Sequence, residues 1–255
     1  MKKQHETDLK SIDKLRRFML CKWREELACL DEISTEDIAL HIQKAGFRCL
    51  RCGACCRSED GDNRVFITPA EIDLISETHD MDLEDIAVPC IDDILSSSDN
   101  HQELQSFIDT QGNLHPTGWI LRRRFNGDCK FISDAGPSSK CRIYNARPGL
   151  CSTYPFHMEN MNLEICECPG LGMDIEWKEC MAIARKVIQR YISELRDFIS
   201  TYEKYEYFSS SSKGYDIYLR RLSEGKSICI VHDSRGISKG FLVSDCEGLR
   251  FIRTV

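Results

Sequence analysis

Four cysteines stand within eight residues, at Cys49, Cys52, Cys55 and Cys56. Gly53 lies between them and permits a tight turn of the backbone. Thiolates held this close together are typical ligands of zinc or of an iron–sulfur cluster. The chain has fifteen cysteines in all. An odd number of cysteines in a chain without a visible secretory signal does not suit a disulfide framework, so we interpret them mainly as metal ligands.

The spacing of this first group differs from several familiar cysteine motifs. The ferredoxin run would place a fourth cysteine four residues after Cys55, where Glu59 stands. Cys52 and Cys56 have the first spacing of a radical-SAM site, but the next cysteine is again missing at position 59. No zinc-finger histidine pair and no glycine-rich nucleotide loop follow. Because adjacent side chains diverge on an extended backbone, Cys55 and Cys56 favour two neighbouring metal centres.

A second region supplies more thiols within forty residues, at Cys129, Cys141, Cys151, Cys166 and Cys168. His157 follows in the same region. A lone histidine after a Tyr-Pro-Phe sequence is more often structural than a metal ligand. The remaining helix and strand cysteines, at 21, 29, 180 and 229, fit better as small buried hydrophobic residues. Spacing alone singles out no cysteine as a catalytic nucleophile.

Taken together, these motifs resemble the YkgJ-type cysteine-cluster family, described as zinc- or iron-chelating CxxCxxCC domain proteins. The resemblance covers about residues 47–172. It is carried by Cys49-x-x-Cys52-Gly53-x-Cys55-Cys56, Gly127-Asp128-Cys129-x-Phe131, Cys141-x-Ile143-Tyr144-x-x-Arg147-Pro148-x-x-Cys151-x-x-Tyr154-Pro155-Phe156 and Cys168-Pro169-Gly170. It implies eight metal ligands, which would serve two four-cysteine centres: Cys49, Cys52, Cys55, Cys56, Cys129, Cys141, Cys151 and Cys168. Cys166 is an additional candidate beside Cys168, and Arg147 is expected to brace the anionic site.

Zinc and iron–sulfur centres both accept four cysteines, so the metal stays open at this point. The resemblance favours one or two 4Fe-4S clusters used in redox, electron transfer or cluster handling, as in an iron–sulfur oxidoreductase. One alternative is a structural zinc-binding module for protein interaction. A second alternative is a protein-modifying enzyme such as a lysine methylase, since the related flagellin lysine methylases carry a similar cysteine set. The lack of a recognisable cofactor-binding loop counts against that second alternative.

Charge and hydropathy limit the partners that we expect. The net charge of −7 and the pI near 5.6 argue against nonspecific nucleic-acid binding. The apolar runs are far shorter than the ~18 residues that a membrane helix needs. No apolar segment follows the first residues, so no signal peptide is visible. We therefore expect a cytoplasmic protein with a protein partner and no membrane contact.

Several segments around the cysteines read as elements that would position them. Apolar residues at steps of three and four predict helices over 6–31 and from about Thr35 to Lys44, which form an N-terminal arm. Thr68-Pro69-Ala70-Glu71 is a capping box that opens a helix after a short strand. Residues 80–116 are acidic and interrupted, and predict short helices with a long surface loop. The basic triplet 122–124 is expected to be exposed.

The C-terminal third should support the cysteine-rich region and then change character. A continuous apolar stripe predicts one long helix over 174–206 behind the metal site. Three short strands, Ser227–His232, Lys239–Val243 and Leu249–Ile252, predict a meander. The fold class is therefore α+β and mostly helical, with an irregular cysteine-rich metal-binding core and a small C-terminal antiparallel β meander. We divide the chain into four regions: residues 1–46, 47–172, 173–208 and 209–255.

Overall fold

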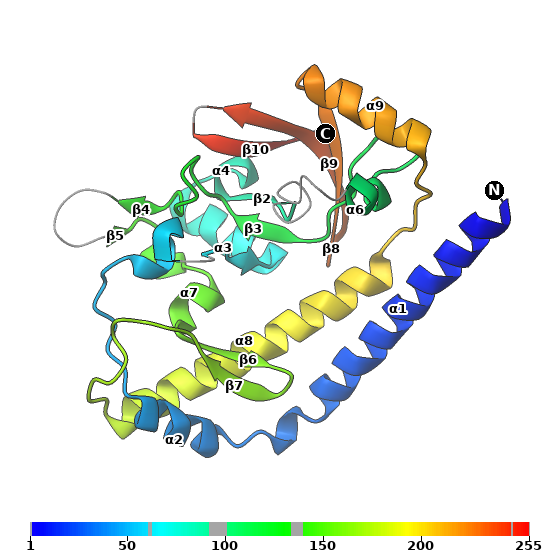
Figure 1. Cartoon of the computed structure of the whole chain (residues 1–255). Coiled ribbons are helices and arrows are strands. Elements are labelled where there is room, and N and C mark those ends of the chain that lie inside the picture. Colours follow the sequence, from blue (N-terminus) through cyan, green and yellow to red (C-terminus); the bar gives the residue numbers. More distant parts are fainter. Residues whose placement is uncertain (1, 61–62, 92–100, 134–139, 246, 255) are drawn as a thin grey trace.

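The structure is a computed structural model that describes residues 2–60, 63–91, 101–133, 140–245 and 247–254. Its α-helices are α1 (Lys2–Ala28), α2 (Thr35–Ala45), α3 (Pro69–His79), α4 (Leu83–Ile86), α6 (His101–Ser106), α7 (Gly149–Thr153), α8 (Trp177–Lys204) and α9 (Ser212–Ser223). Its 3-10 helices are η1 (Leu30–Glu32), η2 (Ala54–Cys56), η3 (Ser58–Asp60) and η4 (Tyr144–Ala146). Figure 1 shows that these elements make a mixed α+β fold, which confirms the predicted class.

The strands form small antiparallel sheets. They are β1 (Phe66–Ile67), β2 (Ala87–Pro89), β3 (Trp119–Leu121), β4 (Ile132–Ser133), β5 (Lys140–Cys141), β6 (Phe156–Glu159), β7 (Asn162–Ile165), β8 (Ser227–Asp233), β9 (Gly236–Asp245) and β10 (Gly248–Arg253). The strand orders are β1-β3-β2 and β10-β9-β8, and β4-β5 and β6-β7 form two-stranded pairs. The three C-terminal strands follow one another in the sheet, so the predicted meander is confirmed.

The N-terminal helices α1 and α2 pack along the long helix α8 (Figure 1). Ile42 of α2 and Cys180 and Ala184 of α8 are fully buried in this core. The hydroxyl of Ser34 accepts a hydrogen bond from the Asp37 backbone and caps α2. Helices α1, α2 and α8 were all predicted. The bounds differ slightly, because α1 begins before residue 6 and α8 begins after residue 174.

A second core lies among the sheets and α3, and it corrects our expectation for residues 80–116. Ile86, Ile108 and Leu114 in this segment are fully buried. The described part of the segment is therefore core structure and not a surface loop. Its acidic residues misled us because they alternate with these buried positions. Residues 92–100, which also fell in the expected loop, lie outside the described residues.

The basic triplet was also wrongly expected to be exposed. Arg122 is fully buried. Its guanidinium lies 3.3 Å from a carboxylate oxygen of Asp85 and donates a hydrogen bond to the Leu249 carbonyl oxygen. Buried charges are tolerated when they are paired and hydrogen-bonded in this way. The arginine thus ties β3 to α4 and to the C-terminal sheet.

Helix α9 was not predicted, because only the three strands of the meander were assigned in region 209–255. Tyr215, Tyr218 and Leu222 nevertheless have helical spacing, which was the missed signal. A side chain at Gly214 would place its Cβ only 2.1 Å from the Asp109 carbonyl oxygen. Gly214 weakens the helix signal in the sequence, but the close approach of Asp109 requires glycine at this position. The four-region division itself remains a prediction.

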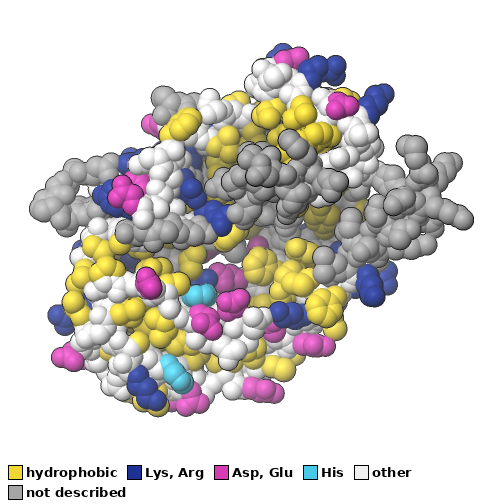
Figure 2. Space-filling model, in the orientation of Figure 1, with side chains coloured by type: hydrophobic (Ala, Val, Ile, Leu, Met, Phe, Trp, Pro, Cys, Tyr) yellow, Lys and Arg dark blue, Asp and Glu magenta, His cyan; other side chains and the backbone are white. Residues whose placement is uncertain are grey.

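Within the described residues, the helices are all too short or too polar to cross a lipid bilayer. Figure 2 shows acidic and basic side chains interspersed over the visible face of the molecule.

Candidate metal centre

The first cysteine group is held by a tight turn that the sequence makes possible. Gly53 has φ 80°, in the left-handed region that glycine adopts readily. Its carbonyl oxygen accepts a hydrogen bond from the Cys56 backbone nitrogen, which closes the 3-10 turn η2. Cys55 and Cys56 therefore lie on a helical turn and not on extended backbone. Their sulfur atoms are 4.0 Å apart, so the premise that they diverge was wrong.

Cys129 is held against this turn by backbone and side-chain hydrogen bonds. Its backbone nitrogen donates to the Cys56 carbonyl oxygen at 2.8 Å. Asp128, which is buried, accepts a hydrogen bond from the Ser58 backbone nitrogen at 3.0 Å. The Asn63 amide donates to the carbonyl oxygens of Cys56 and Gly127. These bonds join segments about seventy residues apart and fix the position of the Cys129 thiol.

Cys141 and Cys151 approach from a strand and from a short helix. Cys141 ends β5 and pairs with Ile132 of β4. Cys151 lies in α7, whose first backbone nitrogen, from Gly149, donates to the Glu71 carboxylate at 2.7 Å. The same carboxylate completes the predicted capping box of α3. Glu71 therefore connects the start of α3 to the helix that presents Cys151.

Cys168 comes from the segment that follows β7. The Gly170 carbonyl oxygen accepts a hydrogen bond from the Arg48 backbone nitrogen, which brings this segment beside the first cysteine group. A Cβ at Gly170 would lie 2.2 Å from the Arg48 carbonyl oxygen, so only glycine fits there. The Tyr154 hydroxyl also donates to the Glu167 carbonyl oxygen. These contacts hold the Cys168 side chain at the pocket.

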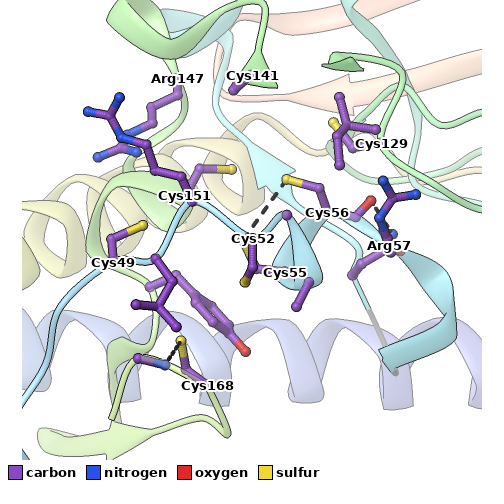
Figure 3. A pocket seen from close by; sticks show the side chains of 18 of the residues that line it. Cys49, Cys52, Cys55, Cys56, Arg57, Cys129, Cys141, Arg147, Cys151 and Cys168 are labelled. Atoms are coloured by element: carbon purple, nitrogen blue, oxygen red, sulfur yellow. Dashed lines mark hydrogen bonds between the residues drawn. The ribbon is translucent and has the colours of Figure 1, made fainter. Parts of the chain in front are cut away.

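All eight cysteines named by the resemblance line one cavity of about 760 Å³. Figure 3 shows them around this space, with Cys56 and Cys129 opposite Cys49 and Cys168. Cys129 is buried, whereas Cys49, Cys52 and Cys55 are exposed. Among the described residues, no three histidine, cysteine or acidic side chains converge as ligands of a single metal ion. The thiols thus surround a cavity rather than one point.

By the neighbouring thiols whose charges act on them, we divide the eight thiols into an inner and an outer group that meet at Cys55 and Cys56. The inner group consists of Cys56, Cys129, Cys141 and Cys151. A hydrogen bond from the Cys56 thiol to the Cys129 sulfur raises the pKa of Cys56 to about 12. Burial, followed by the charges of nearby thiols, raises the pKa of Cys151. In the outer group, Cys49, Cys52, Cys55 and Cys168, burial and the neighbouring thiolates raise the pKa of Cys168. The donor set fits a thiophilic cation, which would replace the protons of these thiols.

The other candidate cysteines lie outside the cavity. Cys166 contacts the His157 ring nitrogen Nδ1 with its sulfur at 3.7 Å, and neither residue lines the cavity. Cys180 is fully buried between α2 and α8, as expected for a small hydrophobic residue. Cys229 is likewise buried in the sheet core. The structure therefore places Cys168, rather than Cys166, with the other seven thiols.

Sequence reasoning missed the polar residues Arg51, Arg57, Asn63 and Glu167 of the cavity wall. Arg51 lies inside the first cysteine group, and its guanidinium stacks on the Tyr144 ring. Arg147, which we expected to brace the site, stacks on the same ring. Arg51 could have been noticed as a charged residue within a tight turn of thiols. Nothing in the pattern, however, linked it to a tyrosine more than ninety residues away.

A mixed α+β chain whose thiols surround one cavity is a cysteine-cluster protein. Residues 48–169 match the family model CxxCxxCC, described as "Putative zinc- or iron-chelating domain", and the predicted resemblance is confirmed. The matched segment contains all eight cavity cysteines. The family description supports metal binding and leaves zinc and iron as alternatives. No match to the chain was found among curated proteins or solved structures.

Proposed function

We propose that the protein carries two four-cysteine iron–sulfur clusters and works in electron transfer, redox chemistry or cluster handling. The observation that carries this proposal is the single cavity lined by eight thiols, which we divide into two groups of four. In this proposal the inner group holds one cluster and the outer group holds the other. Iron–sulfur clusters are commonly held by four cysteine thiolates, which is the number each group supplies.

The exposure of the two groups gives them different roles in this proposal. Cys49, Cys52 and Cys55 are exposed, so a redox partner protein could approach the outer cluster directly. In the inner group Cys129 is buried and the other three thiols are partly buried, and shielding from water slows the loss of a cluster. Solvent exposure and hydrogen bonds to the ligand sulfurs also tune the potential of a cluster. Bound clusters would supply one-electron redox chemistry.

A structural zinc site is the second candidate, and one distance favours it. Zinc–sulfur bonds of about 2.3 Å in a tetrahedral site put neighbouring sulfurs ~3.8 Å apart. The 4.0 Å between the sulfurs of Cys55 and Cys56 is close to that spacing. In this alternative the metal would only fold the domain, and the function would be binding of a protein partner. The lysine methylase alternative stays a prediction from the sequence.

A variant series tests the assignment of the two groups. Iron, zinc and acid-labile sulfide would be measured per chain in Cys129→Ser, for the inner group, and in Cys168→Ser, for the outer group. Each variant should lose about half of the iron and sulfide of the natural chain. Cys229→Ala, outside the cavity, is the matched control and should keep all of it. Equal metal in all four proteins would refute the proposal.

A further inference from the structure

Two arginines at the cavity wall contact the same aromatic ring. The guanidinium carbon of Arg51 lies 5.1 Å from the centre of the Tyr144 ring, and that of Arg147 lies 4.1 Å from it. All three residues line the cavity beside the cysteines. Cation–π stacking fixes a guanidinium by its face. Its edge, which carries the N–H donors, stays available for a planar anion.

The Arg147 charge acts on the thiols of Cys55, Cys141 and Cys151, and Glu167 also lines the cavity, but neither Arg51 nor Arg147 has a carboxylate at ion-pair distance in the described chain. Arg57, in the same cavity wall, lies 3.7 Å from a carboxylate oxygen of Asp128. Arg51 and Arg147 form no such ion pair within the part of the chain that the structure describes. Tyr144 is 40% exposed, Arg51 is exposed and Arg147 is partly exposed, so solvent reaches all three side chains. An anion entering the cavity would therefore find two positive groups there.

The backbone at Arg51 adds an independent observation. Arg51 has φ 53°, in the left-handed region that residues with a side chain rarely adopt. Such conformations cost free energy and tend to persist where the local structure serves a site. Gly53, two residues later, also has positive φ and can adopt it without cost. The strained residue of this turn is therefore Arg51, the arginine that stacks on Tyr144.

The other side chains of the cavity wall indicate what kind of molecule could bind beside the two arginines. Apolar side chains dominate it, among them Leu50, Leu121, Ile132 and Ile143. The volume of about 760 Å³ lies within the range of small-molecule sites, and the proposed metal clusters would take part of it. A singly charged carboxylate costs less to bring into such a wall than a doubly charged phosphate.

We infer that Arg51, Tyr144 and Arg147 form a binding site for the carboxylate of a small molecule with an apolar body. This site goes beyond the proposed metal centres and places such a molecule next to the cysteines. The two arginine edges would accept the carboxylate, and the apolar wall would take the remainder of the molecule. The inference concerns a small ligand, because the groups lie in a cavity and not on a flat face.

The test uses the full chain purified without oxygen, with the metal it carries. Calorimetric titration would compare benzoate with benzamide, an uncharged molecule of the same shape. Benzoate should bind saturably, and benzamide about tenfold more weakly or not at all. Arg51→Gln and Arg147→Gln should each weaken benzoate binding by about tenfold. Arg48→Gln removes an exposed arginine outside the cavity wall and should leave binding unchanged.

Three results would overturn the inference: no saturable binding of benzoate, unchanged binding in both cavity variants, or an equal loss in Arg48→Gln. Metal content would be measured in every variant. If Arg147→Gln loses metal, its benzoate binding cannot be compared with that of the natural chain, and the binding of Arg51→Gln is used to judge the inference. Arginine-dependent binding in a protein without iron would refute the proposed clusters and leave the carboxylate site standing, so the two failures are distinguishable.

Discussion

A buried histidine pair lets the pH dependence of stability be worked out from the structure. His232 on β8 is 1% exposed, and its Nε2 lies 3.0 Å from Nδ1 of His115. The Nε2 of His115 lies 3.2 Å from an Asp109 carboxylate oxygen. The ring of Tyr205, in the connection after α8, stacks on His232. Burial, with a smaller effect of the His115 charge opposed by Asp233, lowers the pKa of His232 from 6.5 to about 4.

The sign and size of the effect follow from this shift. In the unfolded chain His232 takes up a proton near pH 6.5, whereas in the folded chain it does so only near pH 4. Protonation therefore favours the unfolded state, and stability is lost as the pH falls from about 6.5 to about 4. The full loss is about 3 kcal/mol, and about 2 kcal/mol of it falls between pH 7.5 and pH 5. Since the side chain is buried, solvent screening does not reduce this figure.

The assay is urea unfolding under reducing, oxygen-free conditions, followed by helical circular dichroism at pH 7.5 and pH 5. The natural chain should lose about 2 kcal/mol more than His232→Gln between the two pH values. Carboxylates and thiols titrate in both proteins, so their contributions cancel in this difference. His41→Gln removes an exposed histidine on α2 and should behave like the natural chain. An equal loss in the natural chain and in His232→Gln would refute the reasoning.

Further predictions concern the supports of the cavity. Glu71→Gln should lower the free energy of unfolding by about 1–2 kcal/mol, because its carboxylate accepts backbone hydrogen bonds from Thr68 and Gly149; urea unfolding checks this, and an unchanged midpoint would contradict it. Cys180→Ala should cost about 1 kcal/mol of stability while metal content stays the same; loss of metal would instead make Cys180 a ligand. Removal of metal by a chelator should lower the urea midpoint, since ligation and folding are coupled; an unchanged midpoint would contradict that coupling.

Local signals predicted much of the fold. The capping box at Thr68 and Glu71 and the helix end at Gly46 are short-range features, and both appear as expected. The alternation of the last fifty residues predicted the meander of β8, β9 and β10. These elements depend on contacts between residues close in the chain, so periodicity and turn residues are sufficient to find them.

Long-range packing explains what the sequence could not reveal. Residues 80–116 look acidic and irregular, but Leu114 is buried where it pairs with Cys229 of β8, more than a hundred residues later. Arg122 looks like an exposed charge because its partners, Asp85 and the Leu249 carbonyl, are distant in sequence. The eight cysteines were named from the motif, while their division into inner and outer groups depends on how four separate segments meet. The stacking of Arg51 on Tyr144 is a contact of the same long-range kind.

The most direct test of the proposed clusters is an analysis of the natural chain purified without oxygen. Iron, zinc and acid-labile sulfide would be measured per chain, with an absorption spectrum before and after addition of dithionite. Two four-cysteine clusters predict about eight irons per chain, a matching amount of sulfide and a visible band that dithionite bleaches. About four irons per chain would correspond to a cluster in only one of the two groups. One or two zinc ions with no sulfide and no visible band would contradict the account.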